Sequence, residues 1–184
     1  PESVPTVNVL YWGNFIPHHG VETMVEAATD LPAYNFVFAG KSEQRDSIIK
    51  EADRLGADNI SFPGFLSDAE LEAYIRTADV VLGPLSEYTQ SRMTIGTKVA
   101  EAASLRKAIV LGDNPAPNEV FDHRKSAFLV DPENPEDLAM GLESILSNDY
   151  LQTRLESGSY SVYERYFTPS RVAAQFLAAA EQTT

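Results

Sequence analysis

The chain has 184 residues, of which 43% are hydrophobic and 22% are charged, as is typical of a soluble globular domain with a sizeable core. Its formal net charge of −13 argues against non-specific binding to nucleic acid or to an anionic membrane. The absence of cysteine excludes disulfides, thiolate chemistry and cysteine-based metal sites.

Targeting signals are missing from the pattern. No apolar run approaches the ~20 residues that a membrane-spanning helix needs, and residues 1–6 are neither basic nor apolar, unlike a signal peptide. We therefore expect residues 1–184 to form one cytoplasmic domain without a membrane span, and the start at a bare proline suggests a domain taken from a longer protein.

Short β-rich runs alternate with helical patterns along the chain. The runs that predict strands are residues 7–13, 34–40, 59–65, 78–84, 107–113 and 126–132. The patterns that predict helices are residues 21–31, 47–55, 66–75, 98–104, 136–146, 149–167 and 169–180. This alternation predicts an α/β fold, a Rossmann-like three-layer sandwich around a parallel, doubly wound sheet of about six strands.

Two helix starts carry specific signals. Ser67 and Glu70 form a capping-box pattern at the start of the helix over 66–75. Thr168 is placed as the N-cap of the last helix, with Pro169 as its first residue.

Ligands of doubly wound sheets bind at the carboxyl ends of the strands, where the strand order reverses. The strand ends lack the G-x-G-x-x-G fingerprint, the phosphate-binding G-x-x-x-x-G-K-[ST] loop and the G-x-S-x-G nucleophile elbow. The first strand is not followed by the acidic pair of a phosphoacceptor domain, and no D-x-D sequence occurs. These absences argue against dehydrogenases, P-loop enzymes, hydrolases and receivers, and leave a metal-bound nucleotide-sugar site of the D-x-D kind unsupported.

The loop after the first predicted strand, "GNFIPHHG" over 13–20, leads into a helix N-terminus at Gly20. Exposed N–H groups and the helix dipole make such a terminus an anion site, with His18 and His19 beside it. The alternative is that Gly13 and Gly20 are turn residues and that the histidines are solvated.

The next two strand ends bring further glycines. Gly40 and Lys41 follow the second predicted strand, and Gly64 lies in the turn "FPGFL" after the third. Gly64 would let a flat ring approach the backbone, although such a tripeptide can also be only a turn.

The stretch "SEYTQSRMTIGTKVAEA", residues 86–102, places Arg92 and Lys98 in an acidic chain, with Glu101 one helical turn after Lys98. Two cations and a carboxylate suit a phosphate-bearing ligand. The alternative is a surface pair between Lys98 and Glu101, worth ~0.2–0.5 kcal/mol.

The order and spacing of these segments resemble the C-terminal, donor-binding domain of GT-B glycosyltransferases of the retaining group called family 4. The resemblance covers about residues 7–178 and runs through "VLYWGNFIPHHGVETMVEAA", "FVFAG", "ISFPGFLSDAELEAYIRTADVVLGPLSE", "KVAEAASLRKAIVLGD", "NEVF", "AFLVDPENPEDLA" and "FTPSR". It implies transfer of a hexose from a nucleotide diphosphate sugar to an acceptor hydroxyl, with retention of configuration and no obligatory metal. The unknown acceptor would be recognised by an N-terminal domain that this chain lacks, so the chain would bind nucleotide without turnover.

The chain departs from much of this group at charged positions. The Arg and Lys that grip the donor diphosphate in the first loop correspond to Asn14 and His19 here, and Met93 stands where the first of two glutamates is expected. The sequence is closer to a subset with "IPxHG" and R-x-x-I-x-x-K-x-x-E. His18 or His19 would then be a pH-sensitive substitute for the missing lysine.

The resemblance therefore implies a donor site in which charge has moved between loops. Arg92 and Lys98 would stabilise the departing diphosphate electrostatically, and Glu101 would bind the ribose hydroxyls. The remaining donor contacts are expected at Gly13, Asn14, His19, Gly20, Gly40, Lys41, Gly64, Phe65, Leu66, Gly96 and Thr97, with the base near Gly64–Leu66.

Two other functions stay open from the sequence: a non-catalytic GT-B-like domain with a degenerate donor site, and a sugar-nucleotide epimerase domain. Other candidate residues have plainer interpretations. Tyr11 and Trp12 are expected in the core, His123 is expected at the surface, and the acidic residues over 131–137 are interpreted as a solvated helix start.

Overall fold

The computed structural model describes residues 6–16 and 19–181. Its strands are β1 (Val9–Trp12), β2 (Phe36–Ala39), β3 (Ile60–Gly64), β4 (Val80–Leu82), β5 (Ala108–Gly112) and β6 (Phe128–Val130). All neighbouring pairs are parallel, and the order is β3-β2-β1-β4-β5-β6. The predicted α/β, doubly wound parallel sheet is confirmed, and its strand order reverses between β1 and β4.

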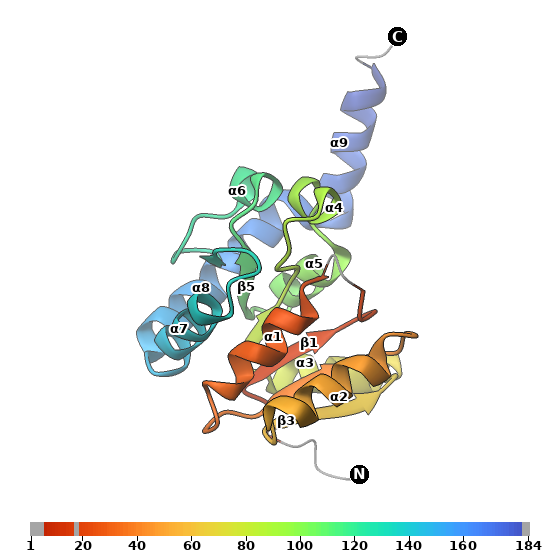
Figure 1. Ribbon diagram of the computed structural model, residues 1–184. Coiled ribbons are helices and arrows are strands. Elements are labelled where there is room, and N and C mark those ends of the chain that lie inside the picture. Colours follow the sequence, from red (N-terminus) through yellow and green to blue (C-terminus); the bar gives the residue numbers. More distant parts are fainter. Residues whose placement is uncertain (1–5, 17–18, 182–184) are drawn as a thin grey trace.

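Helices cover both faces of this sheet (Figure 1). They are α1 (Val21–Thr29), α2 (Arg45–Leu55), α3 (Asp68–Thr77), α4 (Thr89–Met93), α5 (Thr97–Ser104), α6 (Pro115–Val120), α7 (Pro135–Leu146), α8 (Asp149–Val162) and α9 (Pro169–Glu181). One buried cluster joins the sheet to α1, α2, α7 and the start of α8, and a second joins it to α3, α5 and the end of α8. The predicted three-layer sandwich is therefore present.

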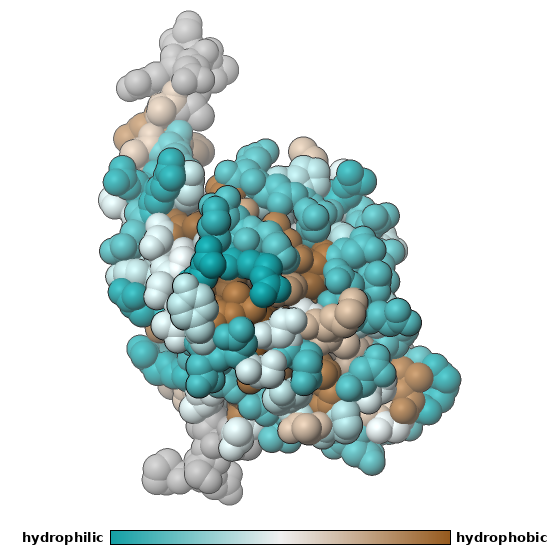
Figure 2. Space-filling model, turned by 90° about the vertical axis from the view of Figure 1, so that its left-hand side faces the viewer, coloured by the Kyte–Doolittle hydropathy of each residue, from teal (hydrophilic) through white to brown (hydrophobic). Residues whose placement is uncertain are grey.

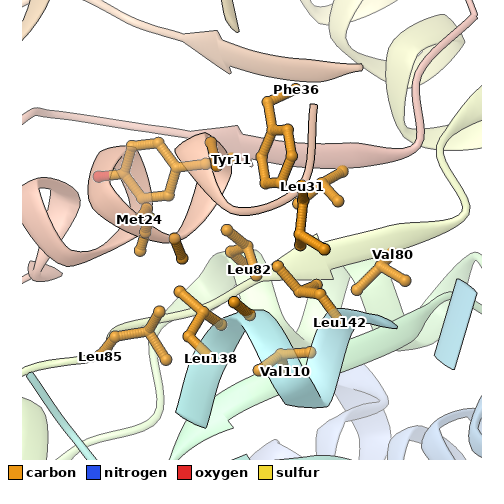
Figure 3. Close-up of a cluster of buried hydrophobic side chains, with 14 of the residues drawn as sticks. Tyr11, Met24, Leu31, Phe36, Val80, Leu82, Leu85, Val110, Leu138 and Leu142 are labelled. Carbon is orange, nitrogen blue, oxygen red and sulfur yellow. The ribbon is translucent and has the colours of Figure 1, made fainter. Parts of the chain in front are cut away.

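The two buried clusters follow from the two-residue period of the strands. On β1, Val9 and Tyr11 belong to the first cluster, whereas Leu10 and Trp12 belong to the second. Figure 3 shows Tyr11 in the first cluster among side chains of α1, the sheet and α7. A strand that is apolar on both faces lies in the middle of the sheet, as β1 does.

The helix starts agree with the sequence signals, whereas some helix ends and short helices do not. The capping box of α3 is complete, since the Ser67 side chain accepts from the Glu70 N–H and the Glu70 carboxylate accepts from the Ser67 N–H. The helix predicted over 149–167 ends earlier, because its last residues form the π-helical turn η2 (Tyr163–Phe167). Helices α4 and α6 were not predicted, since so few residues carry no readable period.

Helix α9 projects away from the body of the domain in both views (Figures 1 and 2). Its apolar side chains Val172, Phe176 and Leu177 are exposed. The face drawn in Figure 2 is otherwise mostly hydrophilic, with hydrophobic side chains showing through in places. Within residues 6–16 and 19–181, no helix combines the length and the apolar character needed to cross a bilayer.

Candidate functional site

Three glycines lie side by side where β1, β2 and β3 end. The N–H of Gly13 donates to the Ala39 carbonyl over 3.0 Å, and the N–H of Gly40 donates to the Gly64 carbonyl over 2.7 Å. Gly40 has a φ of 143°, and a Cβ there would overlap the Gly13 carbonyl oxygen. Only glycine allows the backbones to approach this closely.

A cavity of about 150 Å³ opens beside these glycines. Its lining is mostly apolar and consists of Trp12, Gly13, Asn14, Ala39, Gly40, Lys41, Phe65, Leu66 and Leu71. Phe65 stands at its rim with 69% of its surface exposed, and the Lys41 ammonium lies 4.6 Å from the centre of its ring. Six of the residues predicted for the donor site thus line one cavity: Gly13, Asn14, Gly40, Lys41, Phe65 and Leu66.

Lys98 is the second residue of α5, and it is buried, with 8% of its surface exposed. Its Nζ has no hydrogen-bond partner among the described residues. It lies 4.2 Å from the centre of the Tyr11 ring, and a Cβ on Gly13 would lie 3.0 Å from it. Burial lowers the pKa of Lys98 to about 7, and the nearby charge of Glu101 opposes this shift. A buried, unpaired ammonium group at a helix N-terminus favours an anionic ligand.

The surface pair between Lys98 and Glu101 is not formed. No ion pair joins them within the described residues, and Lys98 points into the protein whereas Glu101 is exposed. Glu101 lines a separate hollow between α3 and α5, and Leu71 borders both this hollow and the cavity. The cavity and the hollow that Glu101 lines therefore adjoin at Leu71.

The loop after β1 is anchored to Tyr11. The Tyr11 hydroxyl donates to the Asn14 carbonyl over 2.7 Å and lies 2.6 Å from Nδ1 of His19. Gly20 is the N-cap of α1 and has a φ of 68°, and a Cβ there would lie 2.8 Å from the Leu85 carbonyl oxygen. His18 lies outside the described residues.

The remaining predicted residues do not line the cavity. Gly96 is the N-cap of α5, followed by the exposed Thr97. Arg92 and Met93 end the short helix α4, and both are exposed. Within the described part of the chain, no ion pair or side-chain hydrogen bond places the Arg92 guanidinium group beside Lys98.

Sequence reasoning assigned Tyr11 and Trp12 to the core, and both are buried. It did not foresee that Tyr11 contacts Lys98 and His19, or that Trp12 lines the cavity. Their place at the end of the central strand was the available signal. His123 is exposed, as expected, and its Nδ1 accepts a hydrogen bond from the Leu129 N–H. No group of three or more potential metal ligands gathers among the residues with a described position.

A parallel sheet in this order, with an open glycine-rich end at the strand reversal, defines a Rossmann-like domain. The sequence narrows this class. The model of the family described as glycosyl transferases group 1 matches residues 5–162, and the chain belongs to this family.

Two curated relatives illustrate the family. The chain is 23% identical over 178 residues to the lipopolysaccharide core biosynthesis glycosyltransferase LpsE of Rhizobium meliloti, covering 96% of this chain and 50% of that protein. It is 26% identical over 152 residues to the alpha-D-kanosaminyltransferase of Streptomyces kanamyceticus, covering 80% of this chain and 38% of that protein. The chain thus spans half or less of the curated relatives that it matches.

Solved structures share the fold. Anabaena Alr3699/HepE, solved with UDP and glucose, superimposes with a TM-score of 0.81 at 17% identity, over 96% of this chain and 49% of that chain. The C-terminal domain of a group 1 glycosyl transferase, LpcC of Francisella tularensis, gives a TM-score of 0.74 at 20% identity, over 89% of this chain and 87% of that chain. The match to an isolated C-terminal domain agrees with the expected domain type.

Proposed function

We propose that this chain is the donor-binding domain of a glycosyltransferase that transfers a hexose from a nucleotide diphosphate sugar to an acceptor hydroxyl. Membership of the group 1 family supports a transferase. The structural neighbour HepE has been solved with UDP-glucose, which supports a nucleotide-sugar donor. Retention of configuration and activity without an obligatory metal are part of the proposal.

The main support for the proposal is that the Lys98 ammonium group is buried without a hydrogen-bond partner among the described residues. An unpaired ammonium group costs free energy when it is buried, and the N-terminus of α5 adds an unfavourable interaction of about 0.3–1 kcal/mol with the helix dipole. Both costs are offset when a phosphate lies between Lys98 and the loop after β1. The site is therefore arranged to bind an anion.

The base and the ribose of a nucleotide-sugar donor can be placed around this anion. The base would enter the apolar cavity beside Leu66, and the ribose hydroxyls would donate to Glu101 across Leu71. The diphosphate would lie between Lys98, the Gly13 backbone and His19. Arg92, whose side chain is exposed in α4, would contact the phosphates from the solvent side.

The acceptor would bind outside the donor site. A domain on the amino-terminal side would recognise it, and the 184-residue chain alone would bind nucleotide without turnover. The enzyme would act in the cytoplasm. Charge that develops on the leaving diphosphate would be stabilised by Lys98, which is the catalytic contribution of this domain.

Calorimetric titration of the chain tests the proposal. UDP, GDP, ADP, CDP and inorganic pyrophosphate are titrated into the wild type, Lys98→Met and the control Lys125→Met, whose lysine is exposed and paired with Asp122. We expect one nucleotide to bind best, and Lys98→Met to weaken every ligand by at least about tenfold, as for loss of a charged hydrogen bond. Lys125→Met should bind as the wild type does.

Failure of all five ligands to bind the wild type would favour the non-catalytic, degenerate domain and overturn the proposal. A longer chain that carries an amino-terminal domain separates the enzyme classes. A transferase yields a glycosylated acceptor together with the nucleoside diphosphate, whereas an epimerase yields an inverted sugar without an acceptor.

A further inference from the structure

Tyr11 connects the two loops that carry the candidate phosphate ligands. The face of its ring lies against the Lys98 ammonium group, 4.2 Å from the ring centre. Its hydroxyl contacts the Asn14 carbonyl and His19 Nδ1, and Figure 3 shows this oxygen at the edge of the buried cluster, directed away from Phe36. One side chain of β1 thus touches both α5 and the loop 13–20.

Three polar atoms form a triangle at this point. Tyr11 Oη lies 2.7 Å from the Asn14 carbonyl oxygen and 2.6 Å from His19 Nδ1, and Nδ1 lies 2.9 Å from the same carbonyl oxygen. Burial raises the pKa of Tyr11 far above its ordinary value, and the charge of Glu22 adds to this effect, so the hydroxyl keeps its proton. If His19 Nδ1 carries no proton, both Nδ1 and the Asn14 carbonyl oxygen are acceptors, and the Tyr11 hydroxyl has only one proton to donate.

The proton count selects one form of His19. A carbonyl oxygen only accepts hydrogen bonds, so a bare Nδ1 at 2.9 Å would place two lone pairs against each other. With a proton on Nδ1, the Tyr11 hydroxyl donates to the Asn14 carbonyl oxygen, and Nδ1–H donates to the hydroxyl oxygen or to the same carbonyl oxygen. Neutral His19 therefore carries its proton on Nδ1, and Nε2 gains a proton only when the ring becomes cationic.

We propose that Tyr11 is a positioning residue of the diphosphate site: its hydroxyl holds His19 in the Nδ1–H form, and its ring supports the ammonium group of Lys98. This inference rests on the proposed function. His19 can then donate from Nε2 to a phosphate only after it has taken up a proton, so binding of the diphosphate and protonation of the loop are coupled.

The charges around this arrangement favour such coupling. Glu22 lies on α1 and Glu101 lies on α5, and both act electrostatically on the groups in question, Glu22 on Tyr11 and Glu101 on Lys98. Lys41, at the end of β2, lines the neighbouring cavity. An incoming diphosphate adds negative charge to a place where Lys98 is only partly protonated near neutral pH.

Nuclear magnetic resonance of the ligand-free 184-residue chain tests the tautomer directly. The imidazole ¹⁵N shifts of His19 are compared in the wild type, in Tyr11→Phe and in the matched control Tyr34→Phe, in which the tyrosine is half-buried and precedes β2 at the opposite end of the sheet. We expect the Nδ1–H form in the wild type and in the control, and a mixture that includes the Nε2–H form in Tyr11→Phe. An Nε2–H form in the wild type, or an unchanged spectrum in Tyr11→Phe, would overturn the inference.

Pyrophosphate titrations test the functional part without assuming a base. Tyr11→Phe should weaken binding about fivefold, as for loss of one hydrogen bond, and should lower the proton uptake measured in buffers of different ionisation enthalpy. In a His19→Ala background the same substitution should cause no further loss, because the hydroxyl acts through His19. The titration of pyrophosphate itself is common to all variants and cancels in the comparison.

These experiments distinguish failure of the proposed donor-binding function from failure of the proposed role of Tyr11. If wild-type chain binds none of the nucleotides and no pyrophosphate, the proposed function fails and this inference fails with it. If ligands bind normally but Tyr11→Phe leaves both affinity and proton uptake at the wild-type values, the donor site stands and the role of Tyr11 is wrong. Equal losses for Tyr11→Phe in the wild-type and His19→Ala backgrounds would also contradict it, since they indicate a general packing effect.

Discussion

The ammonium group of Lys98 lies over the ring of Tyr11, on the side of the sheet opposite to most of its own helix. A ring face attracts a cation, by about 0.5–2 kcal/mol in partly desolvated sites. This contact offsets part of the cost of burying the charge, but it provides no hydrogen-bond acceptor for the three N–H groups of the ammonium. Lys98 is therefore held in place and left with donors for a ligand.

The first prediction concerns stability. Lys98→Met should stabilise the ligand-free chain by up to about 5 kcal/mol below pH 7, because the folded state then no longer buries a charge. The pKa of Lys98 is lowered to about 7 in the folded protein. The gain is thus fully present below pH 7 and disappears as the pH rises toward the ordinary value of a lysine. Urea unfolding at several pH values measures it.

Lys107→Met is the matched contrast. Burial also lowers the pKa of Lys107, but its Nζ donates to the carbonyl oxygens of Arg76 and Ala78 over 2.7 and 2.9 Å. Removing it leaves these acceptors without their partner, so this variant should lose stability. A destabilised Lys98→Met would mean that the ammonium group has a native partner.

The second prediction is a pH dependence of donor binding. A phosphate stabilises the charged form of Lys98, so bound Lys98 has a higher pKa than in the empty site, where the value is about 7. Affinity should therefore be greatest below pH 7 and fall as the pH rises above it. A nucleotide sugar is the appropriate ligand, because its diphosphate does not titrate in this range. In Lys98→Met this component of the pH dependence should be absent, and an unchanged profile would contradict the assignment.

The sheet and most of its helices could be predicted because period and helix caps are local properties of the sequence. The place of the cavity could also be predicted, because ligands bind at strand ends and because Gly13 and Gly40 follow the first two strands, where their backbones approach each other. The contact between Lys98 and Tyr11 could not be predicted, because a lysine in a first helical turn is usually solvated and its burial depends on how α5 meets β1. The position of Arg92 depends on α4, which is too short to be recognised from its pattern.

The third prediction separates the ribose from the phosphates. Glu101→Gln keeps the shape of the side chain but loses its charge, so hydrogen bonds from ribose hydroxyls become weaker by about 1 kcal/mol or more. The affinity for the best nucleoside diphosphate should fall about fivefold to tenfold, whereas that for pyrophosphate should not fall. Calorimetry measures both.

Glu72→Gln is the control for this change, because Glu72 lines the same hollow and is paired with Arg76 on the surface of α3. It should leave both affinities unchanged. Equal losses of nucleotide and pyrophosphate affinity in Glu101→Gln would show that the carboxylate acts on Lys98 or on the general potential of the site, and would remove the ribose contact.

The fourth prediction uses two glycines with positive φ. Gly40→Ala forces a left-handed conformation on alanine and drives its Cβ into the Gly13 carbonyl oxygen. Gly56→Ala, at the end of α2, has a φ of 72° and meets no atom within 4 Å among the described residues. Gly56→Ala should cost about 1 kcal/mol of the free energy of unfolding from backbone strain alone, and Gly40→Ala should cost more. Only Gly40→Ala should also lose nucleotide affinity, because it displaces Gly13 from beside Lys98. Similar unfolding curves for the two variants would show that β1 and β2 can move apart at Gly13 and Gly40 without cost. The close approach of these two glycines would then not determine the shape of the site.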